Sequence, residues 1–378
     1  MLISKLYLGN WRNFKLVDVS LQQRVFLAGP NASGKSNFLD AIRFLQDVAR
    51  EGGGLQKAVN DRGGVSRIRC LAARQPPDVA LRVKLRVDGG DTKWVYTLAF
   101  SHDKKKNAPI ITSEIVKLYG NIILERPDEN DERDRDRLTQ THLQQVSANK
   151  EFREIAEFLE TVRYLHIVPQ LVRDMERAGG RSHDPFGGDF LEQLARAPKK
   201  HLESRLSKIT EALTIAVPQL RELKLERDKL GTPHLYGRYE HWRPRAGWQA
   251  EDQFSDGTLR LIGLLWAVAE GAGPLLLEEP ELSLHPSVVR FIPQMLARVA
   301  QKSRRQVFLS THSPELLADS GIAPDEVLLL YPSKDGTEVI PAKDDENVRQ
   351  SLEAGENMAD AVLVRVAPER PDRLAGYS

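Results

Sequence analysis

The chain has 378 residues, 41% of them hydrophobic, and a formal net charge of +1, so it is long enough for one large domain or two and has no whole-molecule field that would attract nucleic acid. Cys70 is the single cysteine, which excludes an intramolecular disulfide framework. The first residues lack a signal-peptide pattern, and no apolar run approaches the roughly 20 residues of a membrane helix. The sequence therefore predicts a cytoplasmic globular protein without a membrane partner.

The first elements surround one short glycine-rich stretch. Alternating apolar residues predict a strand over residues 2–8 and a returning strand over 14–21, joined by a polar and aromatic corner at 10–14. An apolar run at 25–28 predicts a buried strand. A helical pattern begins after the glycine-rich stretch and ends at Gly52.

The glycine-rich stretch has the P-loop spacing, a glycine and four residues before Gly-Lys-Ser, in the expected context of strand and helix. Its backbone N–H groups and the following helix N-terminus favour phosphate. Lys35 would bridge the β- and γ-phosphates, and Ser36 would hold Mg²⁺. We expect the nucleotide to contact seven residues of this stretch: Gly29, Asn31, Ser33, Gly34, Lys35, Ser36 and Asn37.

An antiparallel meander is expected over about residues 79–125. Residues 79–87 alternate between apolar and basic, and the hairpin signal at 88–91 is followed by strand-like sequence at 94–100 and 110–124. The basic face of the first strand would either contact nucleic acid or be an ordinary solvated sheet face.

The middle of the chain alternates charged, helical and strand-like segments. Residues 125–137 are nearly all charged without periodicity, which predicts a mobile loop. Helical patterns cover 152–162 and 190–217. Strands are predicted at 164–168, 220–225 and 234–239.

Two apolar strands in the last third end in polar side chains. The run at 273–277 ends at Glu278 and Glu279, and ligands bind at the carboxyl ends of such strands. These carboxylates would hold Mg²⁺ and orient the attacking water, or would simply begin an acidic helix. The strand at 305–309 precedes His312, which would donate a hydrogen bond to a γ-phosphate.

A second candidate anion cradle precedes the first of these two strands in the sequence. Ser255 and Gly257 stand directly before an apolar helix, and a Ser-x-Gly turn at a helix N-terminus favours bound anions. Because the P-loop already supplies one phosphate site, a second cradle indicates a site shared between two subunits. The simpler alternative is that Ser255 is only a helix N-cap.

Taken together, these motifs resemble those of ABC-type P-loop ATPases in the branch that contains RecF, the SMC proteins and the OLD-family ATPases, and they are most similar to OLD-like ATPases without a Toprim nuclease domain. The corner and P-loop are followed by a signature motif at 254–258, Walker B at 275–279, a D-loop at 283–286 and a switch at 310–312. The resemblance implies an α/β fold: a P-loop NTPase core of ABC-ATPase type with an inserted antiparallel β meander and a helical lobe.

The resemblance also implies a layout and residue roles. We expect one composite domain over 1–378, with an N-terminal half at about 1–170, a helical insertion at about 171–250 and a C-terminal half at about 251–378. The implied roles are Walker B acid and metal ligand for Glu278, catalytic base for Glu279, γ-phosphate sensor for His312, Q-loop metal ligand or plain surface residue for Gln170, and a cap on the partner protomer's ATP for Ser255 and Gly257.

The implied function is an ATP- and Mg²⁺-dependent switch. A homodimer would close around ATP, hydrolyse it, and control DNA or a separate effector protein in DNA repair or antiviral defence. Alternatives are the nucleotide-binding subunit of a transporter and an ATP-binding scaffold with little turnover. The sequence departs from the family pattern at Glu278, where aspartate is usual, and at Asp256 and Thr258, which replace a glycine and a glutamine.

Overall fold

The computed structural model describes residues 1–72, 78–87, 89–174, 184, 186–241 and 247–367. The chain forms two compact units, each assembled from separate stretches. Unit 1 contains residues 1–163, 272–276 and 297–378, and unit 2 contains 164–271 and 277–296. No helix in the described part of the chain is long and apolar enough to cross a membrane.

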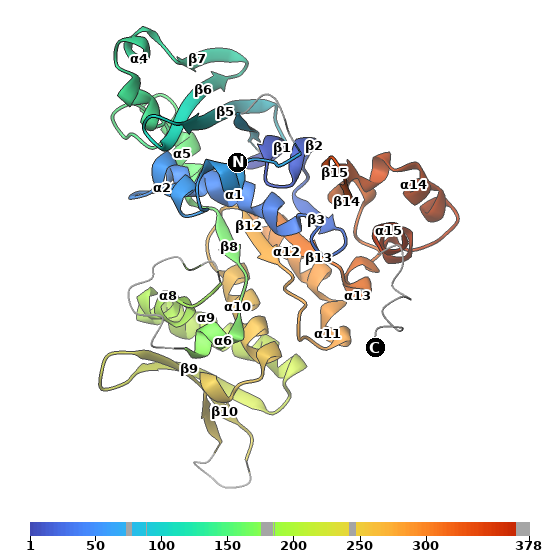
Figure 1. The fold of residues 1–378 in the computed structure, drawn as a ribbon. Helices are drawn as coiled ribbons and strands as arrows, with labels where there is room; N and C mark the ends of the chain where they lie inside the picture. The colour runs from blue at the N-terminus through green and yellow to red at the C-terminus, as the bar shows by residue number, and fades with distance from the viewer. Residues whose placement is uncertain (73–77, 88, 175–183, 185, 242–246, 368–378) are drawn as a thin grey trace, which may run out of the picture. The chain divides into compact units, whose positions relative to one another are not determined.

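Unit 1 contains a six-stranded antiparallel sheet in the order β2-β1-β4-β5-β6-β7 (Figure 1). Its strands are β1 (Leu2–Trp11), β2 (Phe14–Ser20), β4 (Val79–Arg86), β5 (Thr92–Asp103), β6 (Ala108–Leu118) and β7 (Asn121–Arg126). The meander is present, and β4 pairs with β1 so that it extends the N-terminal hairpin. Asp88 of the predicted hairpin turn lies outside the described residues. On β4, Leu81 and Val83 are buried whereas Arg82 is exposed and lies 4.8 Å from the Tyr7 ring centroid.

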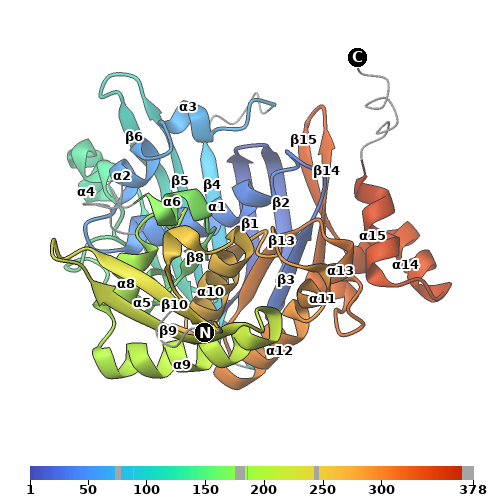
Figure 2. The same ribbon diagram turned by 90° about the horizontal axis from the view of Figure 1, so that it is seen from below.

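The second sheet has the order β15-β14-β3-β13-β12-β8 and contains the parallel strands that carry the P-loop and the switch (Figure 2). Its strands are β3 (Arg24–Ala28), β8 (Arg163–Leu165), β12 (Leu275–Glu278), β13 (Val307–Thr311), β14 (Val327–Ser333) and β15 (Gly336–Pro341). β3 pairs in parallel with both β13 and β14, and its apolar residues are buried. This burial explains why β3 reads as a continuous apolar run.

Helix α1 (Lys35–Ala49) buries the predicted apolar face, including Phe38, Ile42 and Leu45. Phe44 lies 5.2 Å from the Trp11 ring centroid, which joins the helix to β1. The other helices of unit 1 are short: α2 (Leu55–Asn60), α3 (Val65–Ile68), α4 (Glu129–Arg133), η1 (Arg135–Thr139), α5 (Arg153–Glu160), α13 (Pro314–Leu317), η3 (Pro324–Glu326), η4 (Ala342–Asp344), α14 (Glu346–Glu353) and α15 (Met358–Val366).

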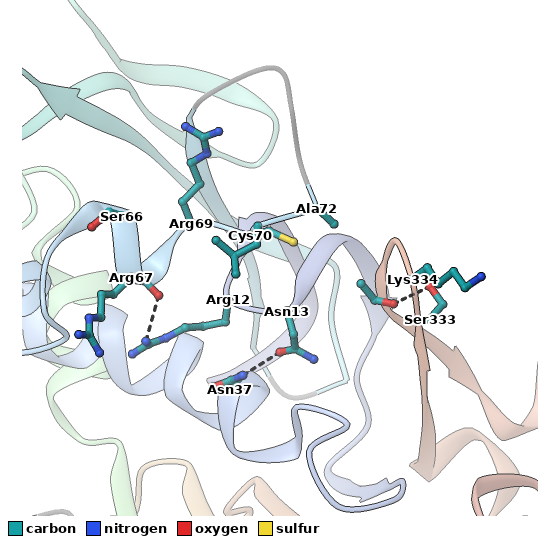
Figure 3. Close-up of a pocket in the computed structure, with 12 residues that line it drawn as sticks. Arg12, Asn13, Asn37, Ser66, Arg67, Arg69, Cys70, Ala72, Ser333 and Lys334 are labelled. Atoms are coloured by element: carbon teal, nitrogen blue, oxygen red, sulfur yellow. Dashed lines mark hydrogen bonds between the residues drawn. The ribbon is translucent and has the colours of Figure 1, made fainter. Parts of the chain in front are cut away.

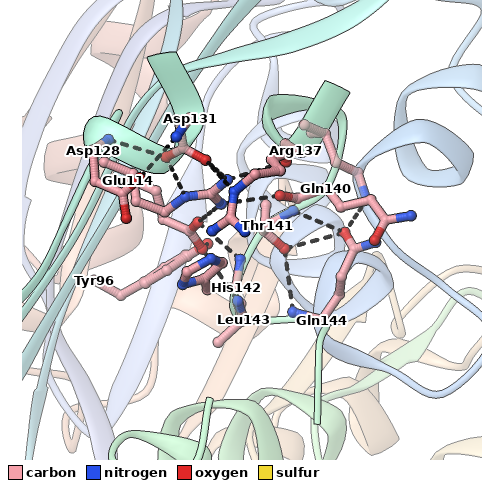
Figure 4. A network of polar contacts seen from close by, with 12 residues as sticks. Tyr96, Glu114, Asp128, Asp131, Arg137, Gln140, Thr141, His142, Leu143 and Gln144 are labelled. Carbon is pink, nitrogen blue, oxygen red and sulfur yellow. Dashed lines mark hydrogen bonds and ion pairs between the residues drawn. The ribbon is translucent and has the colours of Figure 1, made fainter. Parts of the chain in front are cut away.

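The prediction of a mobile loop over residues 125–137 is wrong. This segment contains the end of β7, the helix α4 and the start of η1, which surround a buried polar network (Figure 4). Arg126 lies 2.9 Å from Glu114 and 2.8 Å from Asp131, and all three side chains are buried. Glu114 also accepts hydrogen bonds from the Tyr96 hydroxyl and two backbone N–H groups. Although burial opposes ionisation, the hydrogen bonds from Arg126 keep the pKa of Asp131 well below its usual value. Paired charges therefore order a segment that has no hydrophobic period.

Unit 2 combines helices with a three-stranded antiparallel sheet in the order β11-β10-β9. The strands predicted near 220–225 and 234–239 are both present. Gly237 lies on β10, where an added Cβ would be 2.9 Å from the Phe254 ring, so a glycine lets this ring pack on the sheet. The elements that the structure describes in this unit include α6 (Pro169–Arg173), α8 (Phe190–Arg196), α9 (Lys199–Ala216), β9 (Leu220–Arg227), β10 (Pro233–Tyr239), β11 (Trp248–Ala250), η2 (Glu251–Gln253), α10 (Asp256–Ala269), α11 (Pro286–Val289) and the start of α12 (Ile292–Ser303).

Candidate functional site

The P-loop connects β3 to α1 through a tight turn that requires glycine. Gly34 is the N-cap of α1 with φ of 100°, and an added Cβ would lie 2.1 Å from Asn13 Nδ2. A Cβ on Gly29 would lie 2.5 Å from Ser33 Oγ. Helix α1 has no side-chain cap. A phosphate at this N-terminus would accept hydrogen bonds from its backbone N–H groups and complement the helix dipole.

The Lys35 side chain folds back over this loop. It is 6% exposed, and its Nζ donates to the carbonyl oxygens of Gly29 at 2.8 Å and Pro30 at 3.1 Å. Ser33 is buried, and its Oγ has no hydrogen-bond partner among the described residues. The curled backbone, the held ammonium group and the unsatisfied hydroxyl fit a phosphate ligand. Asn31 on this loop and Ser36 in the first turn of α1, also predicted to contact nucleotide, are both exposed.

Asn13, in the turn between β1 and β2, holds the P-loop from outside. Its Nδ2 donates to Ser33 O at 2.8 Å and to Thr337 Oγ1 at 2.7 Å, and its Oδ1 accepts from Asn37 Nδ2 at 2.8 Å. Asn37 is predicted to contact nucleotide, and in the structure its side-chain amide donates to Asn13, the residue that supports the loop. The sequence indicated the polar corner, but not the role of Asn13, whose partners are distant in the chain.

A pocket of about 780 Å³ in unit 1 lies beside Asn13 and Asn37 (Figure 3). Among the described residues that line it, four are basic and none is acidic, and the basic ones are Arg12, Arg67, Arg69 and Lys334. Arg12 has φ of 52°, and its guanidinium donates to Arg67 O at 3.2 Å. The buried Cys70 also lines this pocket. The surroundings of the β1–β2 turn are therefore complementary to negative charge.

The switch strand runs beside the P-loop strand within unit 1. β13 and β3 are parallel, with Thr311 opposite Ala28. His312 and Gly29 therefore follow directly at the same edge of the sheet, the edge at which ligands bind in such folds. Ser310 and Thr311 are buried, whereas His312 is exposed. The sequence predicts each motif at the carboxyl end of a strand, and the role of His312 toward nucleotide stays a prediction.

The predicted catalytic carboxylates lie in unit 2, at the end of β12. Glu278 accepts a hydrogen bond from the Tyr164 hydroxyl of β8. Glu279 has φ of 42°, an unusual backbone conformation for a residue other than glycine. Such conformations concentrate at functional sites. Tyr164 was missed from the sequence, since a tyrosine in a short apolar strand gives no signal of a partner 114 positions away.

The signature turn and the D-loop are packed together within unit 2. A Cβ on Gly257 would lie 2.4 Å from Ser283 O, so glycine permits this close backbone approach. Ser255 Oγ accepts from Thr258 N at 3.1 Å, which makes Ser255 the N-cap of α10. The simpler reading of Ser255 is therefore correct as local structure. Its role toward nucleotide stays a prediction.

Helix α6 holds the same signature turn. Arg173 lies 2.7 Å from Asp256 Oδ1, and its Nη2 donates to Phe254 O at 2.7 Å. Gln170 Nε2 donates to Asp256 Oδ2 at 3.4 Å, so its amide contacts the signature turn, while its metal role stays a prediction. Sequence reasoning missed Arg173 because nothing local distinguishes it from other basic residues.

Comparison with known proteins gives the family. The family described as "AAA domain, putative AbiEii toxin, Type IV TA system" matches residues 24–318. Uncharacterized protein MJECL11 of Methanocaldococcus jannaschii is 34% identical over 103 residues, which are 26% of this chain and 82% of that protein. The OLD nuclease of Thermus scotoductus is 40% identical over 47 residues, 12% of this chain and 9% of that nuclease.

The fold resembles that of a solved SMC head. The crystal structure of the SmcHead bound to the C-winged helix domain of ScpA has a TM-score of 0.57 and 13% identity, and the match covers 90% of this chain and 97% of that one. The α/β ABC-type core with its inserted meander and helical lobe is therefore confirmed. The chain belongs to the AAA domain family that matches residues 24–318.

Proposed function

We propose that this protein is a nucleotide-driven switch that binds ATP with Mg²⁺, forms a closed homodimer around it and hydrolyses it to ADP and phosphate. The observation that carries the proposal is the P-loop. Gly34 has the left-handed conformation that the turn requires, Lys35 is folded over the loop carbonyls, and the switch strand ends beside the P-loop. Membership of a P-loop ATPase family supports the same reaction.

The proposed roles follow the chemistry of each side chain. Lys35 and the loop backbone grip the phosphates, and His312 donates to the γ-phosphate. Glu279 takes a proton from the attacking water. Ser36 and Glu278, with Gln170 as a further ligand, offer the oxygen atoms that Mg²⁺ prefers. When bound, Mg²⁺ neutralises charge on the phosphates.

The proposed dimer makes the site composite. Ser255 and Gly257 of one protomer would contact the γ-phosphate held by the P-loop of the other. Helix α10 has 14 residues, so its N-terminus carries the partial positive charge that such a contact uses. Nucleotide binding would then control whether the two protomers stay together.

We infer that the output passes through a separate effector protein or through nucleic acid. The matching family is described in terms of a toxin and a toxin–antitoxin system, which favours prokaryotic defence over DNA repair as the setting. The similar SMC head is bound to a domain of a partner protein. The basic pocket beside Asn13 offers the charge that nucleic acid would require, and binding there would weaken steeply with salt.

The test compares ATP turnover of wild type with three variants. Lys35→Ala should abolish tight ATP binding, and Glu279→Gln should lower turnover by about 100-fold or more because it removes the general base. Lys57→Ala, an exposed lysine on α2, is the matched control and should resemble wild type. With ATP, Glu279→Gln should form a dimer in light scattering, and a pull-down with this variant would identify the effector.

Several outcomes would contradict the proposal. Equal turnover in all four proteins would mean that the P-loop is not the active site. Tight ATP binding without phosphate release by wild type would instead support a scaffold. A membrane permease recovered with the Glu279→Gln protein would support a transporter subunit, and a persistent monomer with ATP would reject the composite site.

A further inference from the structure

Asp256 places a carboxylate inside the proposed phosphate cradle. It is the first residue of α10, between Ser255 and Gly257. A carboxylate at a helix N-terminus interacts favourably with the same dipole that would attract a phosphate. It also repels an incoming triphosphate through like charge. A cradle with an uncompensated Asp256 would therefore bind ATP poorly.

The structure supplies a cation at this carboxylate. Arg173 lies 2.7 Å from Asp256 Oδ1 and also donates to Phe254 O at 2.7 Å. Gln170, three positions earlier on α6, donates to the other carboxylate oxygen at 3.4 Å. Arg173 thus holds the turn on both sides of Ser255, through the backbone before it and the carboxylate after it.

We infer that Arg173 is a positioning residue that makes the α10 N-terminus competent to receive phosphate, by neutralising Asp256 and fixing the turn; this inference rests on the proposed function. The Arg173 and Asp256 side chains are 23% and 39% exposed, and ion pairs this exposed contribute little to folding stability. Because the Arg173–Asp256 pair contributes little to folding stability, its main effect is on the net charge at the α10 N-terminus, where the γ-phosphate of ATP would bind.

Arg260 does not replace Arg173 in this role. It lies on α10 and interacts electrostatically with Asp256, but also with Glu279 and Glu281. Its charge is therefore divided among three carboxylates, whereas Arg173 makes a direct ion pair with Asp256. The charge of the cradle consequently depends on α6, the helix that also carries Gln170.

The test is a double-mutant cycle on the full chain, with ATP-dependent dimerisation and turnover as readouts. Arg173→Ala should raise the ATP concentration for half-maximal dimerisation and the KM for ATP by about tenfold, and added salt should reduce the difference. Asp256→Asn removes the repelling charge, so the double variant should return to within about twofold of Asp256→Asn alone. Arg173→Lys keeps the charge and should remain near wild type. The control is Arg238→Ala, which breaks an exposed pair with Glu222 in the same unit and should change neither readout.

Each other result overturns the inference. If Arg173→Ala resembles wild type, or if Asp256→Asn does not rescue it, charge neutralisation is not the role of Arg173. Should Arg173→Ala fail to fold, a tenfold loss in Arg173→Lys would refute the charge argument instead. Unchanged turnover in Lys35→Ala would refute the proposed function, whereas an inactive Lys35→Ala with a normal Arg173→Ala would refute only this inference.

Discussion

Replacing Asn13 with alanine tests whether the β1–β2 turn holds the P-loop in its conformation. The substitution removes three hydrogen bonds of 2.7 to 2.8 Å, to Ser33, Thr337 and Asn37. A protein hydrogen bond contributes about 1 kcal/mol net. We therefore expect the free energy of unfolding to fall by about 3 kcal/mol. ATP affinity should fall as well, because Ser33 O would lose the contact that fixes the loop.

Urea unfolding and calorimetric ATP titration measure the two effects separately. The matched control is Gln56→Ala, since Gln56 Nε2 makes two 2.8 Å hydrogen bonds to Pro109 O and Thr139 O in the same unit. It should cost about 2 kcal/mol of stability and leave ATP affinity unchanged. The reasoning fails if Asn13→Ala costs under about 1 kcal/mol. It also fails if the variant loses stability but binds ATP as wild type does.

Three further predictions concern buried or second-layer polar groups. Glu114→Ala should lower the free energy of unfolding by about 3 kcal/mol or more in urea titrations, because it leaves the buried Arg126 and two backbone N–H groups short of a partner. Burial and the charge of Arg126 lower the pKa of His142 below 6.5 in the folded protein, so the unfolded chain binds this proton at a higher pH than the folded chain does. The free energy of unfolding should therefore fall as the pH drops from about 6.5 toward the folded-state pKa. Urea titrations across this range should show a shallower fall for His142→Gln. Tyr164→Phe should raise the Mg²⁺ concentration needed for ATP turnover by about tenfold, since Tyr164 orients Glu278; an unchanged Mg²⁺ requirement would remove Tyr164 from the site.

Most strands and the P-loop could be predicted because their signals are local. The alternation in β4 and the apolar run of β3 each lie within about ten residues, and the P-loop spacing is contiguous. The pairing of β4 with β1 could not be predicted, because register depends on which faces are buried in the folded chain. The ordered segment after Arg126 escaped prediction for a related reason. Its stability comes from Glu114, an ion-pair partner on a different strand.

The site divides in the same way. Residues whose chemistry is tied to a motif, such as Lys35 and Glu279, can be selected from the sequence. Residues that act through them, such as Asn13 and Tyr164, are joined to their partners only by folding. The Asn13 bond to Thr337 spans 324 positions and the Tyr164 bond to Glu278 spans 114. Their own sequence neighbours carry no trace of these contacts.

Asp256 departs from the family pattern, and this departure can be used to predict a neighbouring residue. A carboxylate where a glycine is usual, at the start of a helix proposed to receive phosphate, implies by charge alone that a cation lies beside it. The chain has 54 lysines and arginines, so the sequence cannot say which one. The 2.7 Å contact selects Arg173. The departure then has a physical explanation, because Asp256 of the altered signature and Arg173 of α6 form an ion pair whose charges offset each other. Variants of either residue should therefore be made and compared together with variants of the other.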